Sequence, residues 1–208
     1  MFKHNILYKS LFAVSMVACA VAVNAETVSG NAGVTVSNAF DLTKVADLNF
    51  GTIRATQIIS GGSIGTTAGI KVLADGSGSE VLQAVSVTGA DAVSEADIIV
   101  PGTPAEFLIE NAAANSEMEL VLTGATAIPI YEIGDAGGTE VFTLNITPSD
   151  VRVVSGGVET QFNGSNLQTD ATGTVGMKVG GSLRIAAAQD GTIDDTSYIG
   201  TFDITVNY

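Results

Sequence analysis

The last nine residues, Gly200-Thr201-Phe202-Asp203-Ile204-Thr205-Val206-Asn207-Tyr208, decide the fold that we predict for this chain. Polar side chains alternate there with apolar ones, which are Phe202, Ile204, Val206 and Tyr208. A period of two with β-forming residues is typical of a strand with one buried face. Because no polar tail follows, we expect this strand either to close the edge of a β-sandwich or to pair with another subunit.

The same alternation recurs upstream in short segments separated by glycine-rich turns. Ala105–Ile109, Met118–Leu122 and Phe142–Ile146 alternate in this way, and Asp75-Gly76-Ser77-Gly78 is a typical turn sequence. No segment has the apolar spacing of a helix longer than a turn or two. The pattern predicts an all-β protein with about nine or ten strands, enough for two packed antiparallel sheets.

Several local predictions follow the same patterning. We expect a short strand at Leu48–Ile53 and an edge strand at Ala127–Ile133, because Pro129 cannot donate a ladder hydrogen bond. The segments predicted as loops are Gly61–Gly69, Gly89–Asp97, Asn163–Gly173 and Asp190–Ser197. The predicted core consists of Val36, Leu48, Phe50, Phe107, Leu120, Leu122, Phe142, Leu144, Leu183, Phe202, Ile204 and Val206.

The N-terminus has the three parts of a secretory signal peptide. Basic residues precede an apolar run, Leu11–Val23, which is too short to span a membrane. Small residues then lead to a predicted cleavage between Ala25 and Glu26. The alternative is lipid attachment at Cys19, for which Met16 is a poor upstream residue and the apolar run is very short. We therefore predict an exported protein with a signal peptide at 1–25 and one domain at 26–208, located in the periplasm, on the cell surface or outside the cell.

Cleavage at this position would leave a strongly acidic chain. The mature protein has 6 basic and 22 acidic residues, a net charge of −16, and it loses the only histidine and the only cysteine. Such a surface repels nucleic acid and anionic lipid headgroups, so neither is an expected partner. No disulfide can form, although the compartment would permit one.

The composition also excludes whole classes of chemistry. Catalytic triads or dyads that need His or Cys cannot form, nor can a His- or Cys-ligated zinc site. The mature chain lacks Trp and has only Tyr131, Tyr198 and Tyr208, so a sugar-stacking cleft of a carboxylate-based glycosidase would be poorly equipped. We predict that the protein is not an enzyme.

One acidic segment could supply hard oxygen ligands. Asp190, Asp194 and Asp195 lie within six residues and could bind calcium as the only cofactor we consider. The segment lacks the spacing and the closing glutamate of an EF-hand loop, so a solvated acidic turn is the alternative.

Three fragments together carry a resemblance to a known family. They are Val34–Ile53 with its Asp47-Leu48-Asn49-Phe50-Gly51 step, Pro104–Phe107, and Gly180–Tyr208 with its Tyr198-Ile199-Gly200-Thr201-Phe202 step. This combination resembles the secreted bacterial family called domain of unknown function 4402 and is similar at longer range to spore coat protein U and to fimbrial subunits. The resemblance covers essentially the whole mature chain.

The resemblance implies an immunoglobulin-like or pilin-like antiparallel β-sandwich from a bacterium with an outer membrane. It implies no catalytic residue. The sequence departs from the pattern in two ways: chaperone–usher pilins often hold a disulfide, which is impossible here, and the Asp190–Asp195 loop is longer and more acidic.

Two non-enzymatic functions remain after these exclusions. The first is a structural subunit of a surface fibre or coat, with copies of itself or related surface subunits as partners. The N-terminal arm Glu26–Val36 would then add as a strand to the next subunit, because Val28, Val34 and Val36 share one face. The alternatives are that Val34–Leu42 is the protein's own first strand, or that the protein is a monomeric carbohydrate- or protein-binding module.

Overall fold

The computed structural model describes residues 39–59, 61–89, 91–122, 125–135 and 137–208. The chain divides into two units, Met1–Val36 and Ser37–Tyr208, and only the second contains described residues. The predicted cleavage site at Ala25 and Glu26, and the arm with Val28, Val34 and Val36, lie outside them. Among the described residues, no helix is long and apolar enough to cross a membrane.

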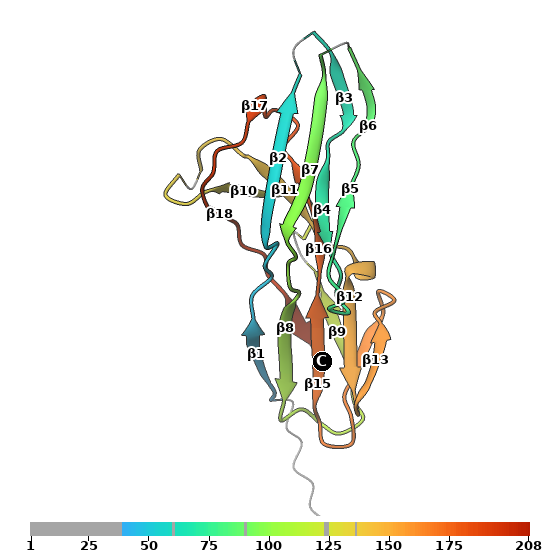
Figure 1. Cartoon of the computed structure of the whole chain (residues 1–208). Coiled ribbons are helices and arrows are strands. Elements are labelled where there is room, and N and C mark those ends of the chain that lie inside the picture. Colours follow the sequence, from blue (N-terminus) through green and yellow to red (C-terminus); the bar gives the residue numbers. More distant parts are fainter. Residues whose placement is uncertain (1–38, 60, 90, 123–124, 136) are drawn as a thin grey trace, which may run out of the picture. The chain divides into compact units, whose positions relative to one another are not determined.

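The described unit is all-β, as predicted, and its strands pair only in antiparallel fashion (Figure 1). The strands are β1 (Asp41–Ala46), β2 (Thr52–Ile58), β3 (Ser63–Thr66), β4 (Gly69–Val72), β5 (Ser79–Leu82), β6 (Val85–Thr88), β7 (Val93–Val100), β8 (Ala105–Glu110), β9 (Glu117–Val121), β10 (Ile128–Glu132), β11 (Phe142–Asn145), β12 (Val151–Ser155), β13 (Val158–Gln161), β14 (Asn166–Gln168), β15 (Val175–Val179), β16 (Gly181–Ile185), β17 (Gly191–Thr192), β18 (Tyr198–Ile199) and β19 (Thr205–Asn207). One 3₁₀ turn, η1 (Pro148–Asp150), precedes β12.

These strands form five sheets. The larger two have the orders β1-β8-β15-β12-β13 and β18-β10-β11-β16-β4-β5, and the smaller ones are β14-β9-β19, β17-β2-β7 and β3-β6. The count of nineteen short strands exceeds the nine or ten predicted, because long strands are interrupted and continue in another sheet. The arrangement is a β-sandwich in which a strand can leave one sheet and continue in another.

Gly180 marks the clearest of these interruptions. It separates β15, which belongs to the five-stranded sheet, from β16, which belongs to the six-stranded sheet. A Cβ at this position would overlap the backbone carbonyl oxygen of Val72 at the end of β4. The close approach of two backbones therefore requires glycine where the strand changes sheets.

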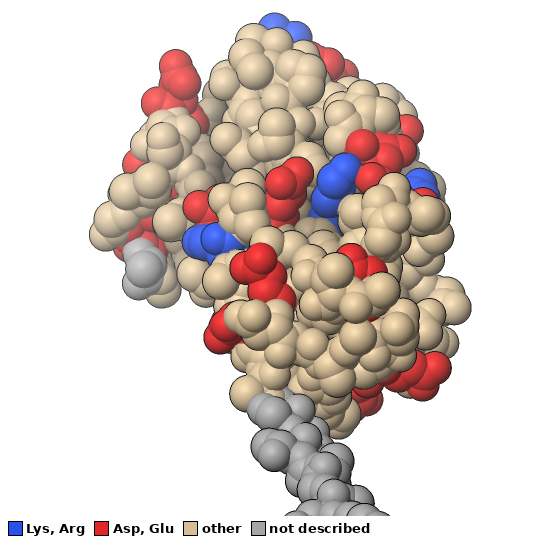
Figure 2. Space-filling view, turned by 90° about the horizontal axis from the view of Figure 1, so that it is seen from below, with Lys and Arg blue, Asp and Glu red and all other residues tan. Residues whose placement is uncertain are grey.

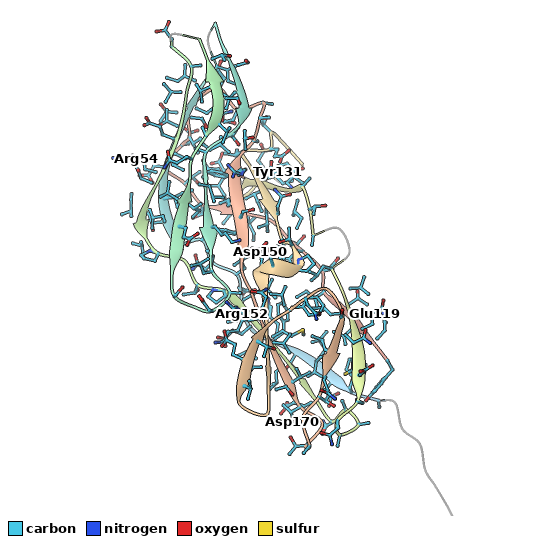
Figure 3. The ribbon with its side chains drawn as sticks, turned by 90° about the vertical axis from the view of Figure 1, so that its right-hand side faces the viewer. Arg54, Glu119, Tyr131, Asp150, Arg152 and Asp170 are labelled. Atoms are coloured by element: carbon cyan, nitrogen blue, oxygen red, sulfur yellow. The ribbon has the colours of Figure 1, made fainter. Side chains whose placement is uncertain are left out.

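Asp150 holds the same junction through a backbone hydrogen bond with Gly180. Its carbonyl oxygen accepts a hydrogen bond from Gly180 N–H at 2.8 Å, and its side chain is only 4% exposed at the end of η1 (Figure 3). Lys71 Nζ on β4 lies 2.6 Å from Oδ1, while Thr147 donates to Oδ2 from its backbone nitrogen and its hydroxyl. Burial alone would raise the pKa of Asp150, but the hydrogen bonds from Lys71 and Thr147 hold it below its ordinary value.

The core confirms only part of the predicted list. Leu120, Phe142, Leu144, Leu183 and Val206 are buried, as alternation predicts. The partly buried members that pack against the core are Leu48, Phe50, Phe107, Leu122, Phe202 and Ile204, and Val36 lies outside the described residues. The largest fully buried side chains include Ile70, Ile109, Met177 and Ile185, which lie on strands with neighbours on both sides.

Several predicted element boundaries are wrong for identifiable reasons. Leu48–Gly51 is no strand, because Gly51 has a φ of +77° and only an isolated Asn49–Thr103 bridge forms there, while Thr52 and Ile53 begin β2. The strand predicted at Ala127–Ile133 is present as β10, but it is not an edge strand, because β18 pairs with its last two residues. Pro129 itself pairs with Thr143 of β11. The four segments predicted as loops contain β3, part of β7, β14 and β17.

Candidate functional site

The carboxylates of the acidic segment Asp190–Asp195 do not form a cluster. No group of three or more His, Cys, Asp or Glu side chains able to hold a metal ion occurs in the described part of the chain. Asp190 Oδ1 instead accepts a hydrogen bond from Ile59 N–H at 2.9 Å. The Asp194 carbonyl accepts hydrogen bonds from the Tyr198 hydroxyl and from Thr196 N–H. The calcium site at Asp190, Asp194 and Asp195 thus stays a prediction from sequence.

The pKa of Tyr198 is affected by the acidic side chains around this segment. Burial raises the pKa of its hydroxyl, and the carboxylates of Glu132, Asp194 and Asp195 raise it further. Its ring packs edge-on against Phe142 with the ring centres 5.2 Å apart. The loop is therefore anchored to the core by an aromatic contact and hydrogen bonds, which is a structural role.

The C-terminal strand is an edge strand in the structure. β19 pairs with β9 through Thr205–Val121, Val206–Leu120 and Asn207–Glu119, and no described strand pairs with its other side. Val206 points into the core, and the Tyr208 side chain is 43% exposed. Only three residues of the predicted Thr201–Tyr208 strand form ladder hydrogen bonds.

β1 is the edge of the neighbouring five-stranded sheet. It pairs with β8, with a register shift between Lys44 and Ala46, and its outer side meets no other strand that the structure describes. Leu42 lies opposite the fully buried Ile109 and so faces the same side, yet its side chain is 37% exposed. An inward-facing apolar residue with this exposure marks a sandwich that is open at this edge.

Aromatic contacts link the two edges. The rings of Phe40, just before β1, and Tyr208, just after β19, meet edge-on with centres 5.5 Å apart. Phe107 and Phe202 form a second edge-on pair, with centres 6.3 Å apart. The Tyr208 hydroxyl also accepts a hydrogen bond from Ala113 N–H at 2.8 Å. We call this region the β1/β19 edge; it comprises β1, β19, Phe40, Phe107, Phe202, Ile204 and Tyr208.

The charged side chains at the β1/β19 edge, Asp41 and Lys44 on β1 and Asp203 before β19, are exposed. Asn111 Nδ2 donates to Asp41 Oδ2 at 2.6 Å, and Lys44 Nζ lies 2.6 Å from Asp47 Oδ1. Pairs this exposed contribute little free energy and do not fix the edge. In Figure 2 the acidic side chains are spread among uncharged ones, with few basic side chains between them. The edge is therefore chiefly apolar and aromatic with unpaired backbone, which suits an added strand better than a charged ligand.

The structure also has two cavities of about 360 Å³ each. One lies between β13 and β14, and the other, at the end of β9, is lined by Leu120, Leu122, Ile146, Pro148 and Phe162. Sequence patterning gave no signal for either cavity, because each depends on how separate sheets meet. The β1/β19 edge did leave a signal, since Phe40 and Leu42 share the parity of the upstream arm.

Comparison with known proteins identifies the family alone. No curated protein and no solved structure matches the chain. The family model described as "Domain of unknown function (DUF4402)" matches residues 40–208, which is most of the chain. The match begins at Phe40 and ends at Tyr208, the two residues whose rings meet at the β1/β19 edge. This protein therefore belongs to the DUF4402 family.

Proposed function

We propose that this protein is an exported structural subunit of a surface fibre or coat that assembles by strand addition. The arm Glu26–Val36 of one copy pairs with the β1/β19 edge of the next. The single observation that carries the proposal is the half-exposed, inward-facing apolar surface between two unpaired strand edges. An added strand would pair the free backbone groups and cover Leu42 and Tyr208.

The arm has the length and the composition that this role needs. Residues 26–38 would span roughly 40 Å if extended, about twice the length of the six-residue β1. Val28, Val34 and Val36 alternate with small or polar residues, and Glu26 has the only charged side chain in the arm. The arm joins the described unit beside Phe40, so a copy that donates it to a neighbour makes a head-to-tail contact, which builds an open fibre.

Deletion of Glu26–Ala32 behind the signal segment tests the donor. We expect wild-type protein to form ladders or fibres that survive mild detergent, and the deletion variant to fold without forming them. Leu42→Glu tests the acceptor, with Val158→Glu on β13 as the control, because Val158 is exposed on another edge strand. Monodisperse wild-type monomers, or ladders that persist in the deletion variant, would contradict the proposal.

A monomeric binding module is the second candidate, and the cavity beyond β9 is the observation in its favour. Its size is within the range of small-ligand sites, and its lining is mostly apolar. The absence of Trp argues against stacking on a sugar ring. A glycan-array signal from monomeric protein, abolished by Phe162→Ala in a folded variant, would favour this function over assembly.

A further inference from the structure

β5 and β6 form a second unpaired strand edge. β5 ends the six-stranded sheet, and β6, which follows it after two residues, pairs only with β3. Figure 1 shows β5 and β6 one after the other along the outer side, with no described strand beyond them. At its start, Ser79 is held to the rest of the unit, because its hydroxyl accepts a hydrogen bond from Gly102 N–H at 2.9 Å. The free part begins at Glu80.

This edge exposes valine side chains where a guarded edge would carry charge. Val81 is 39% exposed although it lies opposite the fully buried Ile70, and Val85 is 56% exposed. The stretch from Val81 to Val85 contains no charged residue and no proline. Natural edge strands usually carry lysine, proline or a bulge that prevents pairing. After Val85, the regular strand backbone is interrupted at Ser86, which has a φ of +58°.

The charge distribution favours a second copy of this chain as the partner. A chain with a net charge of −14 repels its own copies wherever carboxylates face each other. β7 carries Glu95 and Asp97, β13 carries Glu159 and β1 carries Asp41, whereas Val81–Val85 carries no acid. Self-contact there brings no carboxylates into opposition.

We propose that two copies pair their Val81–Val85 segments antiparallel across a two-fold axis through Gln83. Val81 of each copy then lies opposite Val85 of the other, and the two Gln83 side chains face each other. Such an isologous contact is self-complementary and joins two six-stranded sheets into one. The ladder stops before Ser86 and leaves Glu80 outside it. Five residues give a small interface, so isolated chains associate weakly, while subunits in an array associate strongly through many such contacts.

Cysteine cross-linking tests the register directly. In a chain carrying Cys19→Ala, the thiol introduced by Gln83→Cys is the only one. Because the two-fold axis passes through this residue, mild oxidation should give a disulfide-linked dimer. We expect it to form roughly tenfold faster, or more, than with the control Val158→Cys, since pairing raises the effective concentration of the partner thiol. Equal rates for the two variants would overturn the proposal.

Two further variants separate this contact from the arm. Adding Val85→Lys to the Gln83→Cys chain should remove the rapid cross-linking, while Val158→Lys should not, and unchanged thermal midpoints would show that both variants fold. Deletion of Glu26–Ala32 should leave cross-linking faster than in the Val158→Cys control, although slower than in assembled protein, because the contact itself does not need the arm. Rapid cross-linking that survives Val85→Lys, or that disappears with the arm, would show that this edge is not the interface.

Discussion

The carboxylate of Asp150 joins the two large sheets through its ion pair with Lys71 and its hydrogen bonds from Thr147. Breaking a buried ion pair leaves an uncompensated charge in the interior, which is much more costly than losing an exposed pair. We expect Lys71→Met to lower the free energy of unfolding by about 3 kcal/mol, measured by urea denaturation at pH 7. Lys44→Met is the matched control, because its pair with Asp47 is exposed, and its loss should stay below about 1 kcal/mol. Equal losses would contradict this account.

The same carboxylate makes stability depend on pH. The folded pKa of Asp150 is lowered, so its stabilising contribution is complete above the pKa of an unfolded aspartate, about 3.9. It is lost as the pH falls through the lower folded pKa. Hydrogen bonds from Ser77 and Thr172 also lower the pKa values of Asp75 and Asp170. We expect the melting temperature to fall below about pH 4, and to fall less steeply in Asp150→Asn. Parallel pH profiles for the two proteins would show that Asp150 does not contribute.

At the scale of the strand, the change of sheet at Gly180 depends on the missing side chain. We expect Gly180→Ala to destabilise the protein by about 1–3 kcal/mol, because the new methyl group forces apart the backbones of β4 and the β15–β16 strand. Gly176→Ala, on β15, is the control, since its Cβ would make only ordinary contacts with Val154. Its effect on the free energy of unfolding should be small. Similar melting temperatures for the two variants would contradict the close approach that we describe.

Alternation of large apolar residues predicted those strands whose buried face is built from them. β8, β9 and β11 lie where the pattern placed them. β7 was predicted largely as a loop because its inward positions include the small residues Ser94 and Ala96, yet it pairs with β2 along its whole length. Such a strand forms because it pairs with a strand distant in sequence, and local strand propensity does not reveal that pairing. Gln57 is a similar case, because it is fully buried and its Nε2 donates to the carbonyls of Ala186 and Gln189.

The candidate site was predictable in part for the same reason. The C-terminal alternation predicted an unguarded strand near the chain end, and β19 is an edge strand. The role of Phe40 and Leu42 depends on which strands neighbour β1, and a single sequence does not reveal this. The acidic segment shows a prediction that sequence spacing alone suggested. Asp190, Asp194 and Asp195 are close in sequence, which suggested that they share a ligand, but in the structure Asp190 accepts a hydrogen bond from Ile59 N–H.

At the scale of the whole molecule, net charge opposes every form of self-assembly. The acidic side chains are dispersed over the face in Figure 2, so two approaching copies repel each other at long range whichever edges they use. Neither proposed contact relies on ion pairs: the arm carries only Glu26, and Val81–Val85 carries no charge. Salt shortens the range of the repulsion, to about 10 Å at 0.1 M, and leaves backbone hydrogen bonds and apolar burial largely intact.

We therefore expect sodium chloride to promote assembly of the protein. Sedimentation velocity at fixed protein concentration should show a larger mean mass at 0.3 M than at 0.01 M salt, with the shift abolished by combining the Glu26–Ala32 deletion with Val85→Lys. Either change alone should leave part of the shift, because each removes one of two independent contacts. Assemblies that dissociate as salt rises would instead show that ion pairs hold the copies together, and neither strand edge could then be the principal interface.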